Sequence, residues 1–261
     1  MTELHRSEIS PVEPKPAATI ILLRDGDAAL EVLLLQKSSG QHFAAGAIVF
    51  PGGKVEQADI AFADAISNED PFATLKIAAV REMYEECGLM LARRHGAARV
   101  MHAAEIVNCC DSYPSSSLLE LAQSVPLELA IDQLVRFAHW ITPPSRPKRF
   151  DTHFFIAPAP DGQSTIEVDG YEIVDANWRS PADILDEVNA GLLKLVLPTL
   201  MNILKLSNWS SVDEAMAAAR DEIVVEVTPK RIESDEGTYL HFPVEAGYGV
   251  TRISADLLRS A

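Results

Sequence analysis

The chain has 261 residues, of which 48% are hydrophobic and 23% charged, a composition typical of a globular protein rather than a disordered or fibrous one. Its 22 basic and 38 acidic residues give a formal charge of −16, so we expect no nucleic-acid partner. Three cysteines make no disulfide framework, which favours a reduced, cytoplasmic location. No apolar run approaches the roughly 20 residues that span a bilayer, so we expect no membrane partner.

The N-terminal part predicts an arm followed by a hairpin. Residues 1–16 are polar and contain three prolines, and we expect them to form a disordered arm. Two apolar runs, 17–23 and 30–36, flank an Asp-Gly turn and predict a β-hairpin. A short third strand over 47–50 ends at Pro51-Gly52-Gly53, where only a tight loop fits.

The next segments predict helices. Residues 56–69 are acidic and are expected to form an inserted helix or loop. Asp70 followed by Pro71 predicts a helix start, with Asp70 as the N-cap. Apolar residues then recur at helical spacing as far as Cys87, and Gly88 is expected to end the helix.

The remaining chain mixes helices and strands in irregular order. The expected helices cover 118–125, 181–189, 192–206 and 212–220. The expected strands cover 134–141, 152–157, 224–227 and 239–242, with a strand pair or a strand and loop over 168–178. This mixture predicts an α/β or α+β layered domain.

Three glutamates on the helix that ends at Gly88 are the most informative feature. Glu82, Glu85 and Glu86 stand at i, i+3 and i+4, so they project from one face. Carboxylates at the C-terminal end of a helix oppose its dipole and repel one another, and a divalent cation removes both problems. Arg81 lies four residues before Glu85, close enough to hold that carboxylate.

The string Arg81-Glu82-Met83-x-Glu85-Glu86-x-Gly88-Leu89 resembles the second half of the Nudix hydrolase signature. The first half is found at Gly53, preceded by Gly52. The acidic position six residues after Gly53 is Asp59 rather than Glu, and 21 residues instead of 7 separate it from Arg81. The resemblance implies a Nudix α/β/α sandwich with a mixed β-sheet and a C-terminal extension.

The same resemblance implies roles for the site residues. Glu82, Glu85 and Glu86 would bind Mg²⁺ or Mn²⁺, with the carbonyl of Gly53 as a further ligand. Arg81 would orient the catalytic carboxylates, and the general base would be Glu82, Glu85 or an acid from a later loop. Glu172 is our candidate for that later acid, although it also reads as an ordinary exposed strand residue.

A second pattern resembles the Nudix enzymes that cleave coenzyme A. Its spacing is kept from Leu33 to Gly53, but Lys37 and His42 replace two arginines. The interrupted Nudix box and the run Arg149-Phe150-Asp151-Thr152-His153-Phe154-Phe155 also resemble the acyl-coenzyme A diphosphatase branch. Lys37, His42 and Arg149 are therefore the expected substrate-binding residues, while exposed loop charges remain the alternative.

Three functions follow as competing predictions. The first is Mg²⁺-dependent hydrolysis of the phosphoanhydride in coenzyme A or acyl-coenzyme A. The second is the same chemistry on a small molecule such as ADP-ribose, NADH or a nucleotide sugar, and the third is a non-catalytic nucleotide-binding module. We expect the Nudix domain to cover 17–206, with 207–261 as an extension that packs on or completes it or forms a homodimer interface.

Overall fold

The computed structural model describes residues 12–40, 46–66, 69–112, 117–163, 166–168 and 170–258. The strands are β1 Lys15–Asp25, β2 Leu30–Lys37, β3 Ile48–Val49, β4 Gly52–Lys54, β5 Ala92–Arg94, β6 Leu127–Leu129, β7 Val135–Ile141, β8 Phe150–Pro158, β9 Ile173–Arg179, β10 Glu226–Val227, β11 Lys230–Ser234, β12 Gly237–His241 and β13 Arg252–Ser254. The helices are α1 Gln57–Ala65, α2 Ala73–Cys87, α3 Ala103–Ser112, α4 Leu118–Ser124, α5 Pro181–Asn189, α6 Leu197–Leu206 and α7 Val212–Asp221.

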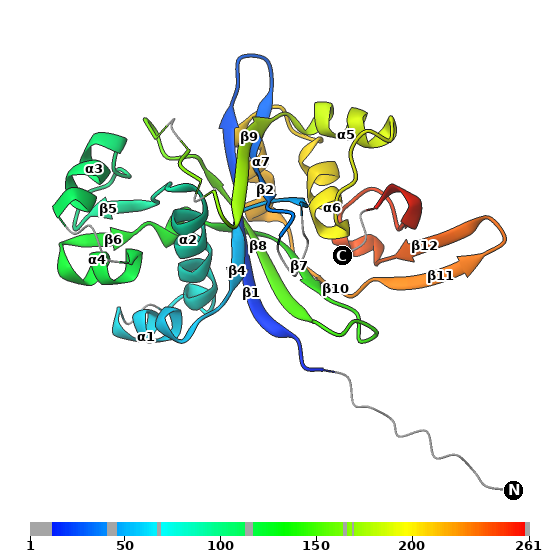
Figure 1. The fold of residues 1–261 in the computed structure, drawn as a ribbon, viewed down its shortest axis with the longest axis horizontal. Helices are drawn as coiled ribbons and strands as arrows, with labels where there is room; N and C mark the ends of the chain where they lie inside the picture. Colours follow the sequence, from blue (N-terminus) through cyan, green and yellow to red (C-terminus); the bar gives the residue numbers. More distant parts are fainter. Residues whose placement is uncertain are drawn as a thin grey trace, which may run out of the picture.

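A mixed sheet of eight strands forms the centre of the molecule (Figure 1). Its order is β10-β7-β8-β1-β2-β3, while β4 pairs with β1 and β9 pairs with β2. Strand β1 pairs antiparallel with β2 and parallel with β8, and both faces of β1 are buried. Its apolar side chains therefore supply two cores, one on each face of the sheet.

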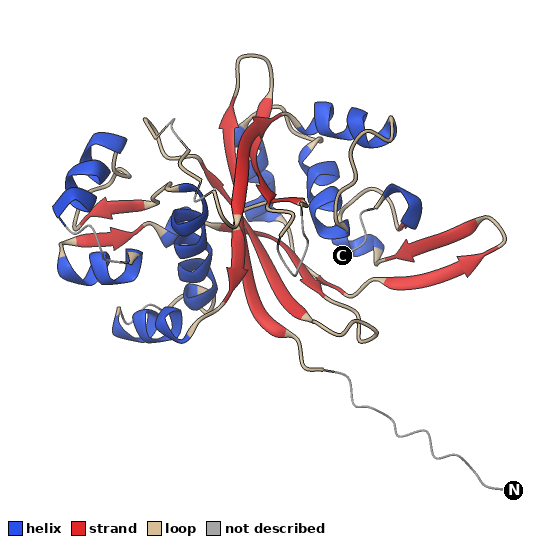
Figure 2. Ribbon diagram, viewed as in Figure 1, coloured by secondary structure: helices blue, strands red, loops and turns tan. Residues whose placement is uncertain are grey.

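Helices cover both faces of this sheet (Figure 2). On one face, α1, α2 and α4 and the small β5–β6 sheet enclose a core that includes Ile20, Leu22 and Phe155. On the other face, α5, α6 and α7 enclose a core that includes Ile21 and Leu23. The predicted α/β/α sandwich with a mixed sheet is therefore confirmed.

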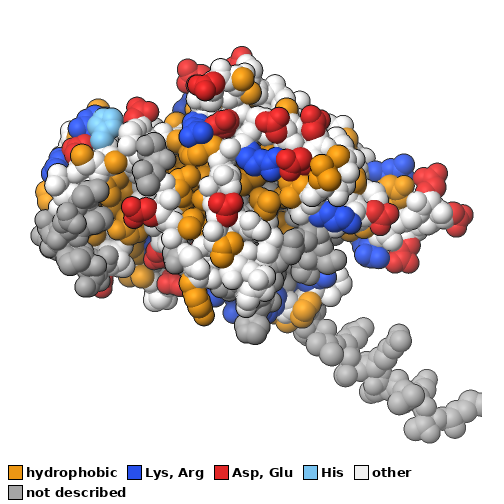
Figure 3. All heavy atoms as spheres, turned by 45° about the horizontal axis from the view of Figure 1, so that its top comes forward, with side chains coloured by type: hydrophobic (Ala, Val, Ile, Leu, Met, Phe, Trp, Pro, Cys, Tyr) orange, Lys and Arg blue, Asp and Glu red, His pale blue; other side chains and the backbone are white. Residues whose placement is uncertain are grey.

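The C-terminal segment adds to both the sheet and the second core. Strand β10 pairs parallel with β7 at the sheet edge, and α7 packs against β1, β7 and β8. Trp140 Nε1 donates a buried hydrogen bond of 2.8 Å to the hydroxyl of Tyr248. Strands β11, β12 and β13 form a separate sheet, and Figure 3 shows charged side chains of both signs on its projecting hairpin.

Several element boundaries differ from the prediction, and Gly52 and Gly53, expected in a loop, begin strand β4. Strand β1 begins at Lys15, inside the expected arm. Helix α2 begins at Ala73 because the side chain of Asp70 accepts the N–H of Phe72 and forms a turn before the helix. Helix α6 begins at Leu197, since a proline is tolerated only in the first turn and Pro198 occupies it. No helix of the described residues is long and apolar enough to cross a membrane.

Candidate active site

The C-terminal half of α2 carries the three glutamates to the start of β4, at Gly52 and Gly53. The helix ends at Gly88, as predicted, with a left-handed φ of 70° and an N–H donated to the carbonyl of Tyr84 at 2.9 Å. The α-helix cannot continue past this left-handed residue, so Glu85 and Glu86 lie in its last turn. Glu86 is almost completely buried, at 6% exposure.

Arg81 is held in a buried pair with Asp59 of α1. Its Nε donates to Oδ1 of Asp59 at 2.8 Å and its Nη2 donates to Oδ2 at 3.0 Å. Nη2 also donates to the carbonyl of Lys54 at 3.0 Å. Asp59 is fully buried. Because this carboxylate–guanidinium pair is bidentate, it fixes the plane of the guanidinium. Helix α1 lies between the two halves of the sequence motif, and it orients Arg81 on α2.

The remaining donor of Arg81 holds two of the glutamates. Nη1 donates to Oε2 of Glu85 at 2.8 Å and to Oε1 of Glu82 at 3.1 Å. The predicted Arg81–Glu85 contact is therefore present. On the other side of Glu82 lies Gly53, where a Cβ atom would overlap the Glu82 carboxylate. A side chain at Gly53 would therefore push the Glu82 carboxylate out of this position.

Glu86 faces a second group of residues that come from distant parts of the chain. The N–H of Gly52 donates to its Oε2 at 2.8 Å, and Lys37 Nζ lies 3.6 Å from its Oε1. Lys37 Nζ also lies 3.2 Å from Oε1 of Glu172. The antiparallel pairing of β2 with β9 produces this contact, because Lys37 ends β2 and Glu172 directly precedes β9.

Burial changes the acidity of these carboxyl groups. Burial raises the pKa of Glu86 to about 7, against the opposing effects of the Lys37 charge and the Gly52 hydrogen bond. Burial likewise raises the pKa of Glu82, and the opposing effect of Arg81 is not sufficient to cancel it. A buried carboxyl group gains from a nearby divalent cation, because binding of the ion would release the proton that burial favours.

The donor set fits a hard divalent cation. Carboxylates and carbonyl groups are the ligands that Mg²⁺ and Mn²⁺ prefer. Each glutamate uses only part of its acceptor capacity on Arg81, Lys37 or Gly52. The ligand atoms of the three do not all lie within 4.8 Å of one another, so they would have to converge on an ion.

Of the predicted substrate residues that the structure describes, Arg149 is bonded away from this cluster. Arg149 donates to the carbonyl groups of Thr142 and Val12, at 2.9 and 2.7 Å. His42 lies outside the described residues. Lys37 is the predicted substrate residue that the structure brings to the glutamates.

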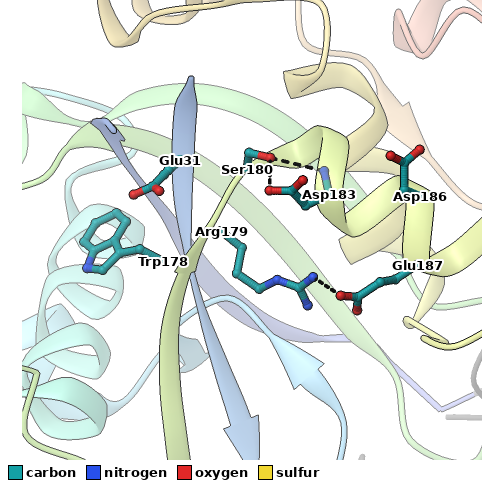
Figure 4. Close-up of a pocket in the computed structure, with 7 residues that line it drawn as sticks. All are labelled: Glu31, Trp178, Arg179, Ser180, Asp183, Asp186 and Glu187. Atoms are coloured by element: carbon teal, nitrogen blue, oxygen red, sulfur yellow. Dashed lines mark hydrogen bonds and ion pairs between the residues drawn. The ribbon is translucent and has the colours of Figure 1, made fainter. Parts of the chain in front are cut away.

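A hollow of about 500 Å³ lies elsewhere, between the end of β9 and α5 (Figure 4). Arg179 is its one cationic side chain, and it is paired with Glu187 at 2.6 Å. Carboxylates dominate the lining, which contains Glu31, Trp178, Arg179, Ser180, Asp183, Asp186 and Glu187. Such a surface repels phosphates, so we place the candidate active site at α2 instead.

Comparison with known proteins identifies the family of this chain. A family model of the NUDT19 Nudix domain matches residues 62–206, which include all of α2. The chain is similar to a Caenorhabditis elegans protein named for the nudix hydrolases, 28% identical over 199 residues that cover 74% of this chain and 60% of that protein. It is also similar to the acyl-coenzyme A diphosphatase NUDT19 of Gallus gallus, 25% identical over 242 residues that cover 72% of this chain and 64% of that protein.

The chain thus spans less than two thirds of the length of these relatives. The crystal structure of a NUDIX hydrolase from Alicyclobacillus acidocaldarius matches with a TM-score of 0.68 and 27% identity, over 79% of this chain and 96% of that chain. The family match covers more than half of the residues. The chain therefore belongs to the Nudix hydrolases, in the family of the NUDT19 Nudix domain.

Proposed function

We propose that the chain is a Mg²⁺- or Mn²⁺-dependent pyrophosphohydrolase that cleaves the phosphoanhydride of coenzyme A or acyl-coenzyme A. The products would be 3′,5′-ADP and a phosphopantetheine. The observation that carries this proposal is the network of contacts that joins the α2 glutamates, through Arg81 and Lys37, to the end of β2 and the start of β9. Such a cluster combines anionic ligands for a metal, a cation for a phosphate and an acid for proton transfer.

The residues divide the chemical work as follows. A bound Mg²⁺ ion would polarise the phosphoanhydride and lower the pKa of the attacking water. Glu82, Glu85 and Glu86, with the Gly53 carbonyl, would hold the ion, and Arg81 keeps Glu82 and Glu85 in position.

Lys37 would exchange its contacts with Glu86 and Glu172 for a phosphate oxygen of the substrate. Glu172 is our proposed general base, with Glu82 and Glu85 as the other candidates. In the reaction, water adds to one phosphorus atom, the base accepts its proton, and the bridging P–O bond breaks.

The choice of coenzyme A rests on similarity rather than on a described pocket. The relatives from Gallus gallus and Xenopus laevis are named acyl-coenzyme A diphosphatases. The Leu33–Gly53 spacing of the coenzyme A pattern is kept, and Lys37 stands at one of its basic positions. Roles for His42 and Arg149 in binding the substrate remain predictions.

A substrate panel tests the proposal. Purified protein with Mg²⁺ is offered acyl-coenzyme A, coenzyme A, 3′-dephospho-coenzyme A, NADH, ADP-ribose and a nucleotide sugar at equal concentration. We expect the highest kcat/KM for acyl-coenzyme A or coenzyme A, and a lower one for the 3′-dephospho form, because a cationic site loses a charged partner.

Two other outcomes of the substrate panel would change the proposal. Faster cleavage of ADP-ribose, NADH or the nucleotide sugar would replace the substrate and keep the chemistry. Nucleotide binding without any cleavage would support the non-catalytic module and overturn the proposal.

A further inference from the structure

A second cluster of ligand-type side chains lies on β7 and β8, apart from the glutamates. His139, Asp151 and His153 are the described His, Cys, Asp and Glu side chains whose ligand atoms all lie within 4.8 Å of one another. His139 stands directly opposite His153 in the antiparallel pair, and Asp151 precedes His153 by two residues. All three therefore project from the same face of the sheet.

The backbone of β7 is shaped so that this convergence occurs. The register between β7 and β8 shifts at Arg136–Ala138, which is a β-bulge. The bulge sets His139 on the face that carries His153, and the two rings stack with centroids 3.9 Å apart at 17°. Bulges of this kind re-aim side chains beside functional sites.

His153 is partly buried, and neither of its ring nitrogens makes a hydrogen bond to the described residues. Its side chain is 12% exposed, its Nδ1 has no partner, and its Nε2 lies 3.8 Å from Oδ1 of Asp151, too far for a hydrogen bond. His139 Nε2, in contrast, lies 2.5 Å from the same oxygen. A ligand on Nε2 would give that nitrogen the partner that Asp151 is too distant to provide.

The spacing suits a tetrahedral transition-metal ion. Zinc bonds to imidazole nitrogen and carboxylate oxygen measure about 2.0–2.2 Å, which places neighbouring ligands about 3.3 Å apart. The observed separations of 2.5 and 3.8 Å bracket that value, so small side-chain rotations would equalise them. Two imidazoles and one carboxylate favour Zn²⁺ over Mg²⁺, whose preferred ligands are oxygens.

We propose that His139, Asp151 and His153 form a Zn²⁺-binding site that ties β7 to β8 and keeps one coordination position for water or an anion. Asp151, whose side chain is 35% exposed, opens the site to solvent. The site does not depend on the proposed hydrolase activity.

The zinc site lies apart from the candidate active site. In the sheet, His153 is aligned with Ala18 and Ala18 with Gly53, so two strand spacings, about 10 Å, separate His153 from Gly53. Paired catalytic metals lie only about 3.5–4 Å apart. The zinc ion would therefore be a separate ion beside the start of α2, where Phe72 contacts the His153 ring.

The test measures Zn²⁺ binding to the full chain after removal of metals, with excess Mg²⁺ present to occupy the glutamates. Isothermal titration compares the wild type with His139→Gln, His153→Gln and the exposed control His95→Gln. We expect the wild type to bind one Zn²⁺, and both cluster variants to bind it at least about 100-fold more weakly. His95→Gln, and Glu86→Gln as a control at the other site, should bind Zn²⁺ as the wild type does. Addition of Co²⁺ to the wild type should give the visible absorption of a tetrahedral site.

Two results would overturn the proposal. The first is a wild-type protein that binds no Zn²⁺ and shows no visible Co²⁺ band, a result that is measured without any variant. The other is unchanged Zn²⁺ affinity in His139→Gln, provided that circular dichroism shows the variant folded. If that variant does not fold, His153→Gln and the Co²⁺ spectrum of the wild type decide the question.

Discussion

The Asp59–Arg81 pair holds the carboxylates of Glu82 and Glu85, our proposed metal ligands, in place. Arg81 connects α1 to two glutamates of α2, and both partners of the buried pair are removed from water. A buried ion pair of this kind contributes little net stability, but losing one partner leaves an uncompensated charge. Asp59 is therefore a positioning residue rather than a ligand.

Replacing Asp59 tests this role. Asp59→Asn keeps the shape but removes the charge beside Arg81, so we expect the free energy of unfolding to fall by about 3 kcal/mol. The matched control is Asp132→Asn, since Asp132 pairs with Arg93 but its side chain is 56% exposed, and its loss should cost less than about 1 kcal/mol. Urea denaturation measures both, and equal losses would contradict the positioning role.

The raised pKa of Glu86 predicts a pH dependence of stability. Its folded-state pKa of about 7 lies above the ordinary value of 4.5, so the folded protein binds the proton more tightly. Metal-free stability should therefore fall as the pH rises from about 4.5 through 7, by on the order of 3 kcal/mol from this group. Unfolding at pH 5 and pH 8 measures the change, and Glu86→Gln should flatten it. An equally steep fall in the variant would contradict the assignment to Glu86.

At the scale of elements, the contact between β4 and α2 sets the position of Glu82. A side chain at Gly53 would overlap the Glu82 carboxylate, whose flexible end can move aside. Gly53→Ala should therefore leave stability within about 1 kcal/mol, yet lower kcat about 100-fold, because a misplacement of about 1 Å is costly in catalysis. Gly40→Ala, where the nearest atom lies 3.8 Å away, is the control. Unchanged kcat in Gly53→Ala would contradict this role.

The end of α2 and its glutamate face could be predicted because both depend on local sequence. Gly88 and the i, i+3, i+4 spacing each lie within one or two helical turns. The start of α2 was predicted wrongly at Asp70, whose side chain serves a turn. The contact of Lys37 with Glu172 depends on the pairing of β2 with β9, and the zinc cluster depends on a bulge, so neither is visible in local spacing.

At the scale of the molecule, the C-terminal segment completes the core on the sheet face opposite α2. Tyr248 packs there against Trp140, whose Nε1 donates to its hydroxyl. Tyr248→Phe leaves that buried donor without a partner, so we expect a loss of about 1–3 kcal/mol in stability. The kcat of the folded variant should be unchanged, because α2 lies on the other face. Thermal unfolding and steady-state kinetics test this, and a large fall in kcat without a stability loss would contradict it.

We propose that the α2 glutamates make this chain a metal-dependent hydrolase. The Mg²⁺-dependent rate of acyl-coenzyme A hydrolysis by the wild type, Glu86→Gln and the exposed control Glu128→Gln tests this role. We expect no turnover in the wild type without a divalent cation, a kcat lowered about 100-fold or more in Glu86→Gln, and wild-type rates in Glu128→Gln. Wild-type rates in Glu86→Gln at saturating Mg²⁺ would contradict it.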